Sequence, residues 1–324
     1  MYDNVDFKIR IEDVSGIDFL NEVPQYLDKI TGEHDFNGDY VVTGILGNNM
    51  NTNHFKVTIS RRGVNIKNGS LCKYYLGDNF KTLGRRDTQE AIGKLSDTLH
   101  LPIDSATVSS IDVAQNFIVK QPVQVYYNHF GELKYAGRSP VTNGEGEIET
   151  LYYYKSKGVL VFYDKIKEQQ SKKQPIPELY QNRNVLRYEQ RYKSRLPNVF
   201  HVERVTASML YSEKFYIDLL NSWRDSYYAI KKINDITINI EAMKGKKDLY
   251  TLGVLSLIEK AGGELAMMTQ IEEAQKSGKI DKKRAYDFRQ VVKAACSEKV
   301  GISAQNECIL ELDRKVKEAV KFYR

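Results

Sequence analysis

The sequence is poor in the residues that build cross-links and soft metal sites, which excludes several classes of protein. Its 324 residues include three cysteines, Cys72, Cys296 and Cys308, and five histidines. The cysteines are too widely spaced for a disulfide framework or a zinc ribbon, and this indicates a reduced, intracellular protein. No two histidines form a His-Xaa-His pair, so a zinc enzyme is not expected.

Long apolar runs and several well-known catalytic motifs are missing as well. No stretch approaches the roughly 20 apolar residues of a membrane span, and "MYDNVDFKIR" at the start lacks the apolar core of a signal peptide. The sequence has no Walker loop, no Gly-Xaa-Gly-Xaa-Xaa-Gly and no Gly-Xaa-Ser-Xaa-Gly. We therefore expect a cytoplasmic protein without a membrane partner that is not a serine hydrolase.

What is present suits a globular protein with a weak basic bias. The hydrophobic content of 41% is enough for a real core, and the length suits two domains or one domain with a large appendage. Lys and Arg exceed Asp and Glu by 48 to 42, a net charge of +6. This bias permits a polyanionic partner without requiring one.

Up to about residue 210 the apolar residues mostly alternate with polar ones, which predicts strands. The candidate strands lie at residues 5–11, 41–45, 55–59, 64–66 and 106–119, and a helix interrupts them from about Asp87 to Leu99. Segments 138–149 and 167–182 are predicted to be surface loops, because glycine, proline and charge replace the apolar period there. No internal repeat is evident in the sequence.

After residue 210 the apolar spacing becomes helical. Phe215, Leu219, Trp223, Tyr227 and Ile230 recur at intervals of three and four residues. Further helices are expected at about 246–261, 264–277, 282–297 and 306–323. The predicted fold class is α+β, with a mostly antiparallel sheet in a domain at residues 1–210 and an all-helical C-terminal domain at residues 211–324.

The stretch "ETLYYYKSKGVLVFYDK", residues 149–165, is predicted to be a β-hairpin. Tyrosine is a strong strand former, and Ser156-Lys157-Gly158 can make the turn. Because side chains alternate along a strand, Tyr152 and Tyr154 share one face and Tyr153 takes the other.

Two further strands carry charged residues on one face. In "SSIDVAQNFIV", residues 109–119, Ile111 and Val113 belong to the apolar face, so the carboxylate of Asp112 should be displayed and not buried. In "NVLRYEQRYK", residues 184–193, Arg187, Glu189 and Arg191 share one face. This ladder is either a solvated surface with mutual ion pairs or a site that binds a phosphate and a metal.

Four segments in this order resemble the rolling-circle replication initiators of filamentous phages and related plasmids. They are "GSLCKYYLGDNF" at 69–80, "SSIDVAQNFIV", "TLYYYKSKGVLVFYDK" and "LRYEQRY". The resemblance covers about residues 55–195 continuously, and the helical tail resembles the less distinctive C-terminal region of the family. It implies a nicking and joining enzyme whose tyrosine attacks a DNA phosphodiester with the help of a divalent metal.

The resemblance also assigns catalytic roles. The family pattern Thr-aliphatic-Tyr-aromatic-Gly, followed by a strand that ends in Tyr-Asp-Lys, nominates Tyr152 as the nucleophile. Because the phenol of tyrosine has a high pKa, a cation must favour the phenolate, and Lys165 or Lys155 is expected to supply it. Tyr154 stands where the family has glycine, so Tyr153 and Tyr154 remain alternative nucleophiles. Ser110 stands where the family usually has an arginine. Lys165 ends a predicted strand, and a lysine in such a place usually faces solvent.

The resemblance further implies a metal and contacts to DNA. Asp112 and Glu189 offer the hard oxygen ligands that suit Mg²⁺ or Mn²⁺. Exposed aromatic rings can stack on unpaired bases while Lys and Arg contact phosphates. The candidate DNA contacts are Tyr153, Tyr154, Lys155, Arg187 and Arg191. The alternative interpretation is that most of the 22 tyrosines simply pack strands.

The function that we expect is the initiation of rolling-circle replication by nicking and rejoining one DNA strand at an origin. A 5'-phosphotyrosyl intermediate conserves the energy of the broken phosphodiester bond, so a free 3'-hydroxyl can reverse the reaction. The expected partners are the DNA origin, as single strand or supercoiled duplex, and the helicase and polymerase of a bacterial host. The alternatives are a mobilisation relaxase and a DNA-binding regulator that has lost catalysis.

Overall fold

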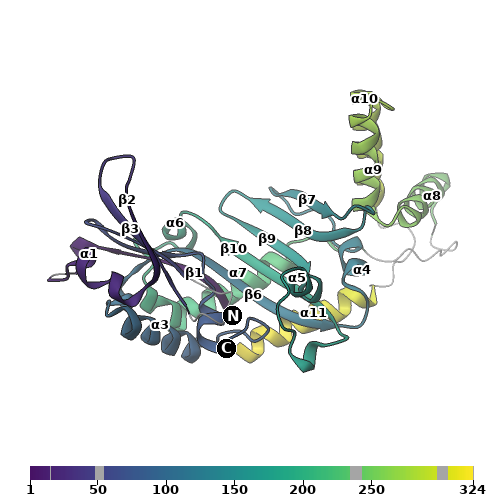
Figure 1. The fold of residues 1–324 in the computed structure, drawn as a ribbon. Helices are drawn as coiled ribbons and strands as arrows, with labels where there is room; N and C mark the ends of the chain where they lie inside the picture. Colours follow the sequence, from purple (N-terminus) through teal and green to yellow (C-terminus); the bar gives the residue numbers. More distant parts are fainter. Residues whose placement is uncertain (15, 48–54, 234–242, 298–305, 324) are drawn as a thin grey trace.

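The computed structural model describes residues 1–14, 16–47, 55–233, 243–297 and 306–323, and these include one ten-stranded sheet (Figure 1). Its strands are β1 (Tyr2–Arg10), β2 (Asp28–His34), β3 (Tyr40–Leu46), β4 (Phe55–Ser60), β5 (Gly63–Lys67), β6 (Thr107–Val119), β7 (Gly137–Thr142), β8 (Ile148–Lys155), β9 (Gly158–Asp164) and β10 (Asn184–Tyr192). The order across the sheet is β2-β3-β4-β5-β1-β6-β10-β9-β8-β7, and each neighbouring pair is antiparallel.

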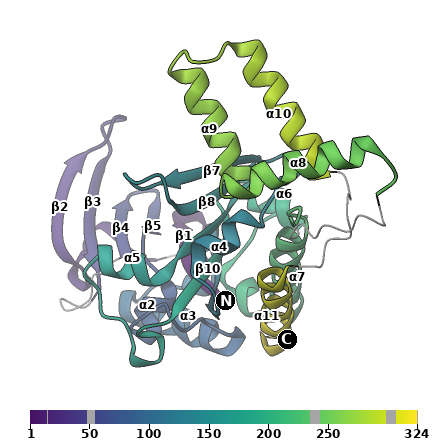
Figure 2. The same ribbon diagram turned by 90° about the vertical axis from the view of Figure 1, so that its right-hand side faces the viewer.

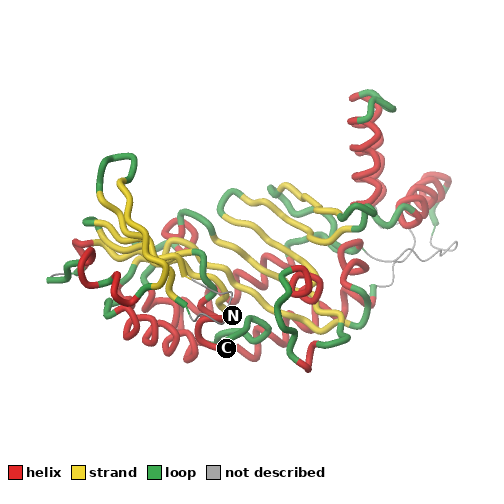
Figure 3. Tube along the Cα trace, in the orientation of Figure 1, coloured by secondary structure: helices red, strands yellow, loops and turns green. Residues whose placement is uncertain are grey.

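Helices pack on one face of this sheet and leave much of the other face open (Figure 3). The described helices are α1 (Phe19–Glu22), α2 (Leu71–Leu76), α3 (Arg85–Leu99), α4 (Val123–Asn128), α5 (Lys165–Ser171), α6 (Leu196–Phe200), α7 (Glu213–Tyr228), α8 (Lys246–Lys260), α9 (Glu264–Lys276), α10 (Lys282–Ser297) and α11 (Glu307–Tyr323). Of these, α5 lies on the open face, and α8, α9 and α10 form a separate cluster. Strands followed by C-terminal helices confirm the predicted α+β class.

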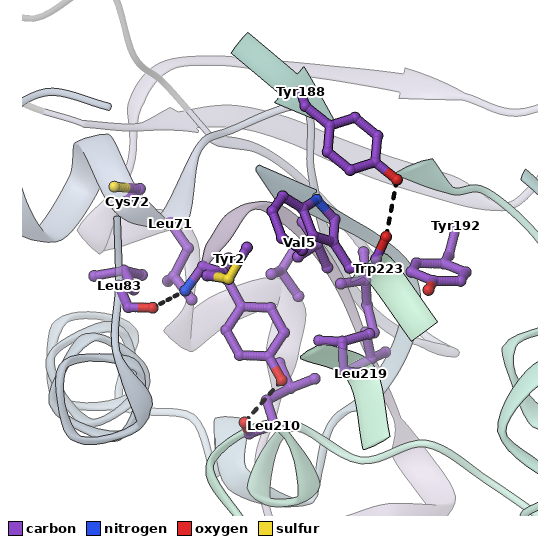
Figure 4. Packing of buried hydrophobic residues seen from close by; sticks show 14 of the residues in the cluster. Tyr2, Val5, Leu71, Cys72, Leu83, Tyr188, Tyr192, Leu210, Leu219 and Trp223 are labelled. Atoms are coloured by element: carbon purple, nitrogen blue, oxygen red, sulfur yellow. Dashed lines mark hydrogen bonds between the residues drawn. The ribbon is translucent and has the colours of Figure 1, made fainter. Parts of the chain in front are cut away.

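The core lies between the sheet and helices α3, α7 and α11. Figure 4 shows Trp223 of α7 against Tyr188 of β10, with ring centroids 4.8 Å apart. The hydroxyl of Tyr188 donates to the carbonyl oxygen of Trp223 at 3.0 Å, and that of Tyr2 donates to Leu210 at 2.8 Å. The predicted helix with Trp223 on its apolar face is therefore confirmed.

The sheet consists of two halves with the same topology, although no repeat is evident in the sequence. The first half runs β1, α1, β2, β3, β4, β5, α2, α3, and the second runs β6, α4, β7, β8, β9, α5, β10, α6, α7. The antiparallel pair of β1 and β6 joins them at the centre, so the strand order is symmetric about that pair. The equivalent helices make equivalent contacts, because α2 packs on β1 as α6 packs on β6, and α1 packs on β4 as α4 packs on β9. The added element of the second half is α5.

The C-terminal helices do not all belong to one core. Helices α7 and α11 contribute Trp223, Leu219, Ile309 and Val316 to the main core under the sheet. Helices α8, α9 and α10 share a smaller cluster that includes Ile258 and Ile271, and in Figure 2 α9 and α10 project side by side beyond the sheet. The domain boundary near residue 210 stays a prediction, and the chain on both sides of it shares the main core.

Both segments that were predicted to be surface loops contain regular structure. Segment 138–149 includes most of β7 and the start of β8, and segment 167–182 begins inside α5. Strand β7 lies at the edge of the sheet, and an edge strand tolerates Pro140, which has no N–H group to donate to a neighbouring strand. Among the described residues, no helix combines the length and the apolar composition that a membrane crossing requires.

Candidate active site on the open face

Strand register brings the predicted nucleophile and a predicted metal ligand into one row of the sheet. Glu189 of β10 pairs with Ala114 of β6 on one side and with Val161 of β9 on the other, and Val161 in turn pairs with Tyr152 of β8. Directly paired residues point to the same face. Tyr152 and Glu189 therefore share the open face, two strands or roughly 10 Å apart along the hydrogen-bonding direction.

The three consecutive tyrosines alternate as predicted. Tyr152 is partly exposed, Tyr154 is 51% exposed, and their rings stack with centroids 5.5 Å apart. Tyr153 is fully buried on the helix-covered face, where its hydroxyl donates to the carbonyl oxygen of Gly131 at 2.7 Å. The prediction that Tyr153 contacts DNA is therefore wrong, because its ring belongs to the core and its hydroxyl is already hydrogen-bonded.

The turn of this hairpin is fixed by a close backbone approach. Lys155 pairs with Gly158, so Ser156 and Lys157 form the two-residue turn. A Cβ atom on Gly158 would lie 2.4 Å from the carbonyl oxygen of Arg191 on β10. Only glycine lets β9 pass β10 at this distance, which keeps Arg191 beside the Tyr152 strand.

In the charged ladder of β10, Arg187 and Glu189 are buried and Arg191 is partly exposed. Arg187 is 0% exposed, and its guanidinium donates to Asn79 at 2.9 Å and to Asn116 at 3.1 Å. It also donates to the carboxylate of Asp3, which comes from the first strand, and to Glu189 at 2.7 Å. The solvated interpretation fails for Arg187 because β1 and the loop before α3 cover this part of the face.

Glu189 is saturated with hydrogen-bond donors. Its Oε1 accepts from Arg187 and from the hydroxyl of Tyr163, each at 2.7 Å, and its Oε2 accepts from Nε of Arg191 at 2.8 Å, with Nη2 of the same arginine at 2.6 Å. Burial alone would raise the pKa of Glu189, but the charges of Arg187 and Arg191 outweigh it and lower the pKa to about 2. The carboxylate is therefore ionised at neutral pH.

Asp112 is also buried, which corrects the prediction that its carboxylate is displayed. It is 1% exposed and pairs in register with Arg191. Its Oδ2 accepts from Asn4 of β1 at 2.9 Å, and the ammonium of Lys193 lies 3.2 Å from Oδ1. Burial raises the pKa of Asp112 while Lys193 acts in the opposite sense. Alternation places Asp112 on the correct face, and Asn4 and Lys193 then cover it.

Asp112 and Glu189 do not fit a divalent cation in this arrangement. A carboxylate has about four lone-pair positions, and Arg187, Tyr163 and Arg191 occupy those of Glu189. No group of three or more His, Cys, Asp or Glu side chains with the spacing of a metal site occurs within the part of the chain that the structure describes. A cation between the two carboxylates requires Arg191 to leave, because its guanidinium neutralises Glu189 beside Asp112.

Lys165 is buried and not solvent-facing, because it begins α5 and not a free strand end. It is 0% exposed, its ammonium lies 2.8 Å from a carboxylate oxygen of Glu168, and it sits 5.5 Å from the ring centroid of Phe80. Burial, together with the charge of Arg187, lowers the pKa of Lys165 to about 8. Lys165 does not line the cavity beside Tyr152.

A cavity of about 330 Å³ opens between α5 and the strands that carry Tyr152 and Arg191. It is lined by Glu149, Thr150, Tyr152, Tyr163, Asp164, Lys167, Glu168, Ser171, Lys172 and Arg191. Lys172 forms an ion pair with Glu168. Burial alone would raise the pKa of Glu168, but the charge of Lys165 outweighs this effect and lowers the pKa to about 2. The cations that line this cavity together with Tyr152 are Arg191, Lys167 and Lys172.

Sequence reasoning missed Lys167 and Glu168 as members of this site, since segment 167–182 reads as a loop, and it assigned no role to Tyr163 of β9. The buried residues of α5 are Lys165 and Gln169, four residues apart. The buried side of α5 is therefore polar, so the sequence shows no apolar residues at helical spacing there. A usable signal was Asp164, whose side chain accepts from two backbone N–H groups as a helix cap.

Lys155 lies away from Tyr152. Lys155 is two residues after Tyr153 in β8, so both side chains lie on the same face of the sheet. The ammonium of Lys155 lies 3.4 Å from the hydroxyl of Ser226 in α7. Partial burial lowers its pKa. The prediction that Lys155 contacts DNA beside the nucleophile is not supported by this position, because its side chain points to the helix-covered face.

Comparison with known proteins identifies a family for the N-terminal two thirds of the chain. The family model Phage_CRI, which describes the N-terminal region of a phage replication-associated protein, matches residues 1–214. The matched region contains all ten strands of the sheet together with α5 and the cavity beside Tyr152. A search of curated proteins finds no match. The chain therefore belongs to the Phage_CRI family of phage rolling-circle replication initiators.

Proposed function

We propose that this replication initiator nicks and rejoins one DNA strand at a replication origin through a covalent bond between Tyr152 and a 5'-phosphate. The observation that carries the proposal is the setting of Tyr152, which is partly exposed and lines a cavity of about 330 Å³ with Arg191, Lys167 and Lys172. A nucleophile, room for a phosphate and cations to balance its charge come together there.

The reaction requires a poorly nucleophilic phenol to attack a charged phosphodiester. The oxygen of Tyr152 forms a bond to phosphorus, its proton passes to solvent, and the bond from phosphorus to the 3'-oxygen breaks. The leaving 3'-oxygen takes up a proton and becomes a free hydroxyl. Rejoining is the reverse, in which a 3'-hydroxyl attacks the phosphotyrosine and releases Tyr152.

The side chains that line the cavity have distinct tasks in this proposal. Arg191 is held by Glu189, so its guanidinium is oriented before the phosphate arrives, and such preorganised charges stabilise a transition state well. Lys167 and Lys172 on α5 favour the phenolate and bind phosphate oxygens. Tyr154, stacked on Tyr152 and 51% exposed, offers a face for an unpaired base.

The divalent cation that the family resemblance implies remains a separate proposal. When bound, such an ion would polarise the scissile phosphate. Asp112 and Glu189 could bind it only after Arg191 breaks its contacts with Glu189 and moves into the cavity, toward which its side chain is 29% exposed. No step above depends on the ion.

The experiment that tests the proposal uses supercoiled plasmid that carries the replicon from which this chain comes, incubated with the protein and Mg²⁺. We expect nicked circles with protein attached to the 5' end of the cut strand. The matched control is Tyr152→Phe, which removes only the phenolic oxygen. Binding of the plasmid without nicking by the wild-type protein would instead support a DNA-binding regulator.

A further inference from the structure

The two halves of the sheet differ in the chemistry of their open faces. The second half carries Tyr152 and the cavity under α5. In the first half the strands equivalent to β9 and β10 are β4 and β5, and Arg61 and Arg62 connect them in a tight turn with no inserted helix. The first half therefore has the same frame without the element that forms the cavity.

The open face of the first half is basic. Lys8 of β1, Lys56 of β4 and Lys67 of β5 are exposed, and alternation sets them opposite the core residues of the same strands. Arg10 is exposed on the same face of β1. We call Lys8, Arg10, Lys56 and Lys67 the basic face. The neighbouring outward positions hold one acid, Asp6 of β1, and the neutral polar residues Thr43, Thr58, Ser60 and Asn65.

Two of these lysines oppose each other directly. Lys56 pairs in register with Lys67 across β4 and β5. Like charges at directly opposed positions destabilise a sheet. Within the described part of the chain, Lys8, Lys56 and Lys67 have no carboxylate within 4.0 Å. Asp6 on the same face offsets part of the charge of Lys67, and the remaining positive charge is left for an external anion to neutralise.

The basic face is continuous with the candidate active site. Asp6 of β1 pairs with Ser110 of β6 and follows Asn4, whose side chain reaches Asp112. Burial raises the pKa of Asp6, and the nearby ammonium groups of Lys193 and Lys67 act in the opposite sense. Lys193 follows β10, two residues after Arg191, and its ammonium lies 3.2 Å from Asp112, so it stands where the basic face meets the candidate active site.

The type of DNA that fits follows from what the basic face carries and lacks. Tyr152 and Tyr154 give the second half aromatic rings for unpaired bases, whereas the outward positions of β1, β3, β4 and β5 hold no aromatic ring: apart from Asp6, they carry lysine, arginine, threonine, serine, asparagine and aliphatic side chains. Lysines with hydroxyl and amide groups contact phosphate and sugar without reading bases. In duplex DNA the bases are paired and the phosphates are what a flat sheet can reach.

We propose that the basic face binds the phosphate backbone of duplex DNA next to the strand that enters the Tyr152 cavity. This inference rests on the proposed function, since it makes the first half of the sheet a docking platform for the DNA that the second half cuts. The two similar halves then have different roles: the first half of the sheet binds duplex DNA, and the second half binds the unpaired strand.

The test compares salt dependence of binding for the variant Lys8→Ala/Lys56→Ala/Lys67→Ala and the wild-type protein. The probes are a 30-base-pair duplex of arbitrary sequence and a single strand of the same length. Loss of three phosphate contacts should make the slope of log K against log salt shallower by about 2.7 on duplex, since each contact contributes roughly 0.9. On the single strand the slope should stay close to that of the wild type.

A matched control removes the same charge from the helix-covered side. Lys214 of α7 and Lys317 and Lys321 of α11 are exposed there, so Lys214→Ala/Lys317→Ala/Lys321→Ala should leave both slopes near wild type. An unchanged duplex slope in the first variant, or an equal change in the control, would overturn the proposal. So would a change confined to the single strand.

Failure of this inference and failure of the proposed function are distinguishable in the same variant. We expect the variant with the three alanines on the basic face to form the covalent adduct with a single-stranded oligonucleotide at the wild-type rate. Its melting temperature should be no lower than that of the wild type, since the repulsion of Lys56 and Lys67 is removed. A wild type that binds duplex as described but forms no adduct would refute only the nicking reaction.

Discussion

Tyr152 and Glu189 flank the same residue of β9, Val161, and therefore lie in one row on the open face of the sheet. The carboxylate of Glu189 is 3% exposed and holds the guanidinium of Arg191, which lines the cavity with Tyr152. A buried carboxylate thus orients the cation that faces the candidate nucleophile. Substitutions can test each part of this arrangement separately.

Arg187→Met should lower the free energy of unfolding by about 3–5 kcal/mol, because it removes the buried positive charge that the buried carboxylates of Asp3 and Glu189 share. Urea unfolding at pH 7 measures the effect. Arg191→Met is the matched control, and it should cost less because that side chain is 29% exposed. A loss below about 1 kcal/mol for Arg187→Met, typical of surface substitutions, would contradict the buried network.

Acid should weaken the fold through Glu189. Its pKa is lowered from 4.5 to about 2, so the stabilisation is fully present above pH 4.5 and is lost as the pH falls toward 2. A shift of this size corresponds to a contribution on the order of 3 kcal/mol. In Glu189→Gln the free energy of unfolding should fall less steeply between pH 5 and 3 than in the wild type. Glu33→Gln, at an exposed residue of β2, should keep the wild-type steepness, and an identical pH dependence in Glu189→Gln would refute the assignment.

Arg191→Met should slow adduct formation by about 100-fold, the loss typical of a preorganised charge at a reacting oxygen. Lys165→Met should slow it far less, because Lys165 does not line the cavity. The rate of adduct formation in Lys172→Met should lie between the rates of Arg191→Met and Lys165→Met. The matched control is the neighbouring Lys173→Met, which should keep the wild-type rate. Single-turnover kinetics on a labelled oligonucleotide gives the rates. If Lys165→Met proved as slow as Arg191→Met, the role assigned to Lys165 from the sequence would regain support.

Arg191→Ala should bind Mn²⁺ more tightly than the wild type, because it frees Oε2 of Glu189 and removes a cation beside Asp112. Asp112→Asn in the same background should weaken that binding. Electron paramagnetic resonance of free Mn²⁺ measures both affinities without DNA or catalysis. Equal Mn²⁺ affinity in all of these variants would place the metal, if one is used, at other residues.

The sequence predicts the parts of the fold that have an apolar period. The helix with Trp223 and the alternation of Tyr152, Tyr153 and Tyr154 are both read correctly, since in each case one face is apolar and the other polar. Helix α5 is not predicted from the sequence, because its buried residues, Lys165 and Gln169, are polar and give no apolar period. The symmetry of the two halves cannot be predicted either, because equivalent strands have the same topology but different sequences.

Alternation predicts which face a residue takes but not what covers that face. Asp112, Arg187 and Glu189 are on the predicted face, yet all three are buried. Their covering partners come from the N-terminal strand, where Asp3 pairs with Arg187 and Asn4 bonds Asp112. Such contacts join residues more than 100 positions apart, and local patterns carry no information about them.

The central claim is that the oxygen of Tyr152 forms the bond to DNA. The most direct measurement digests the covalent adduct with a protease and identifies the modified residue by mass spectrometry, with Tyr152→Phe and Tyr154→Phe as matched variants. We predict a 5'-phosphate on Tyr152, loss of the adduct in Tyr152→Phe with DNA binding retained, and an adduct that persists in Tyr154→Phe. Phosphate attached to Tyr154, or an adduct that survives in Tyr152→Phe, would contradict the account.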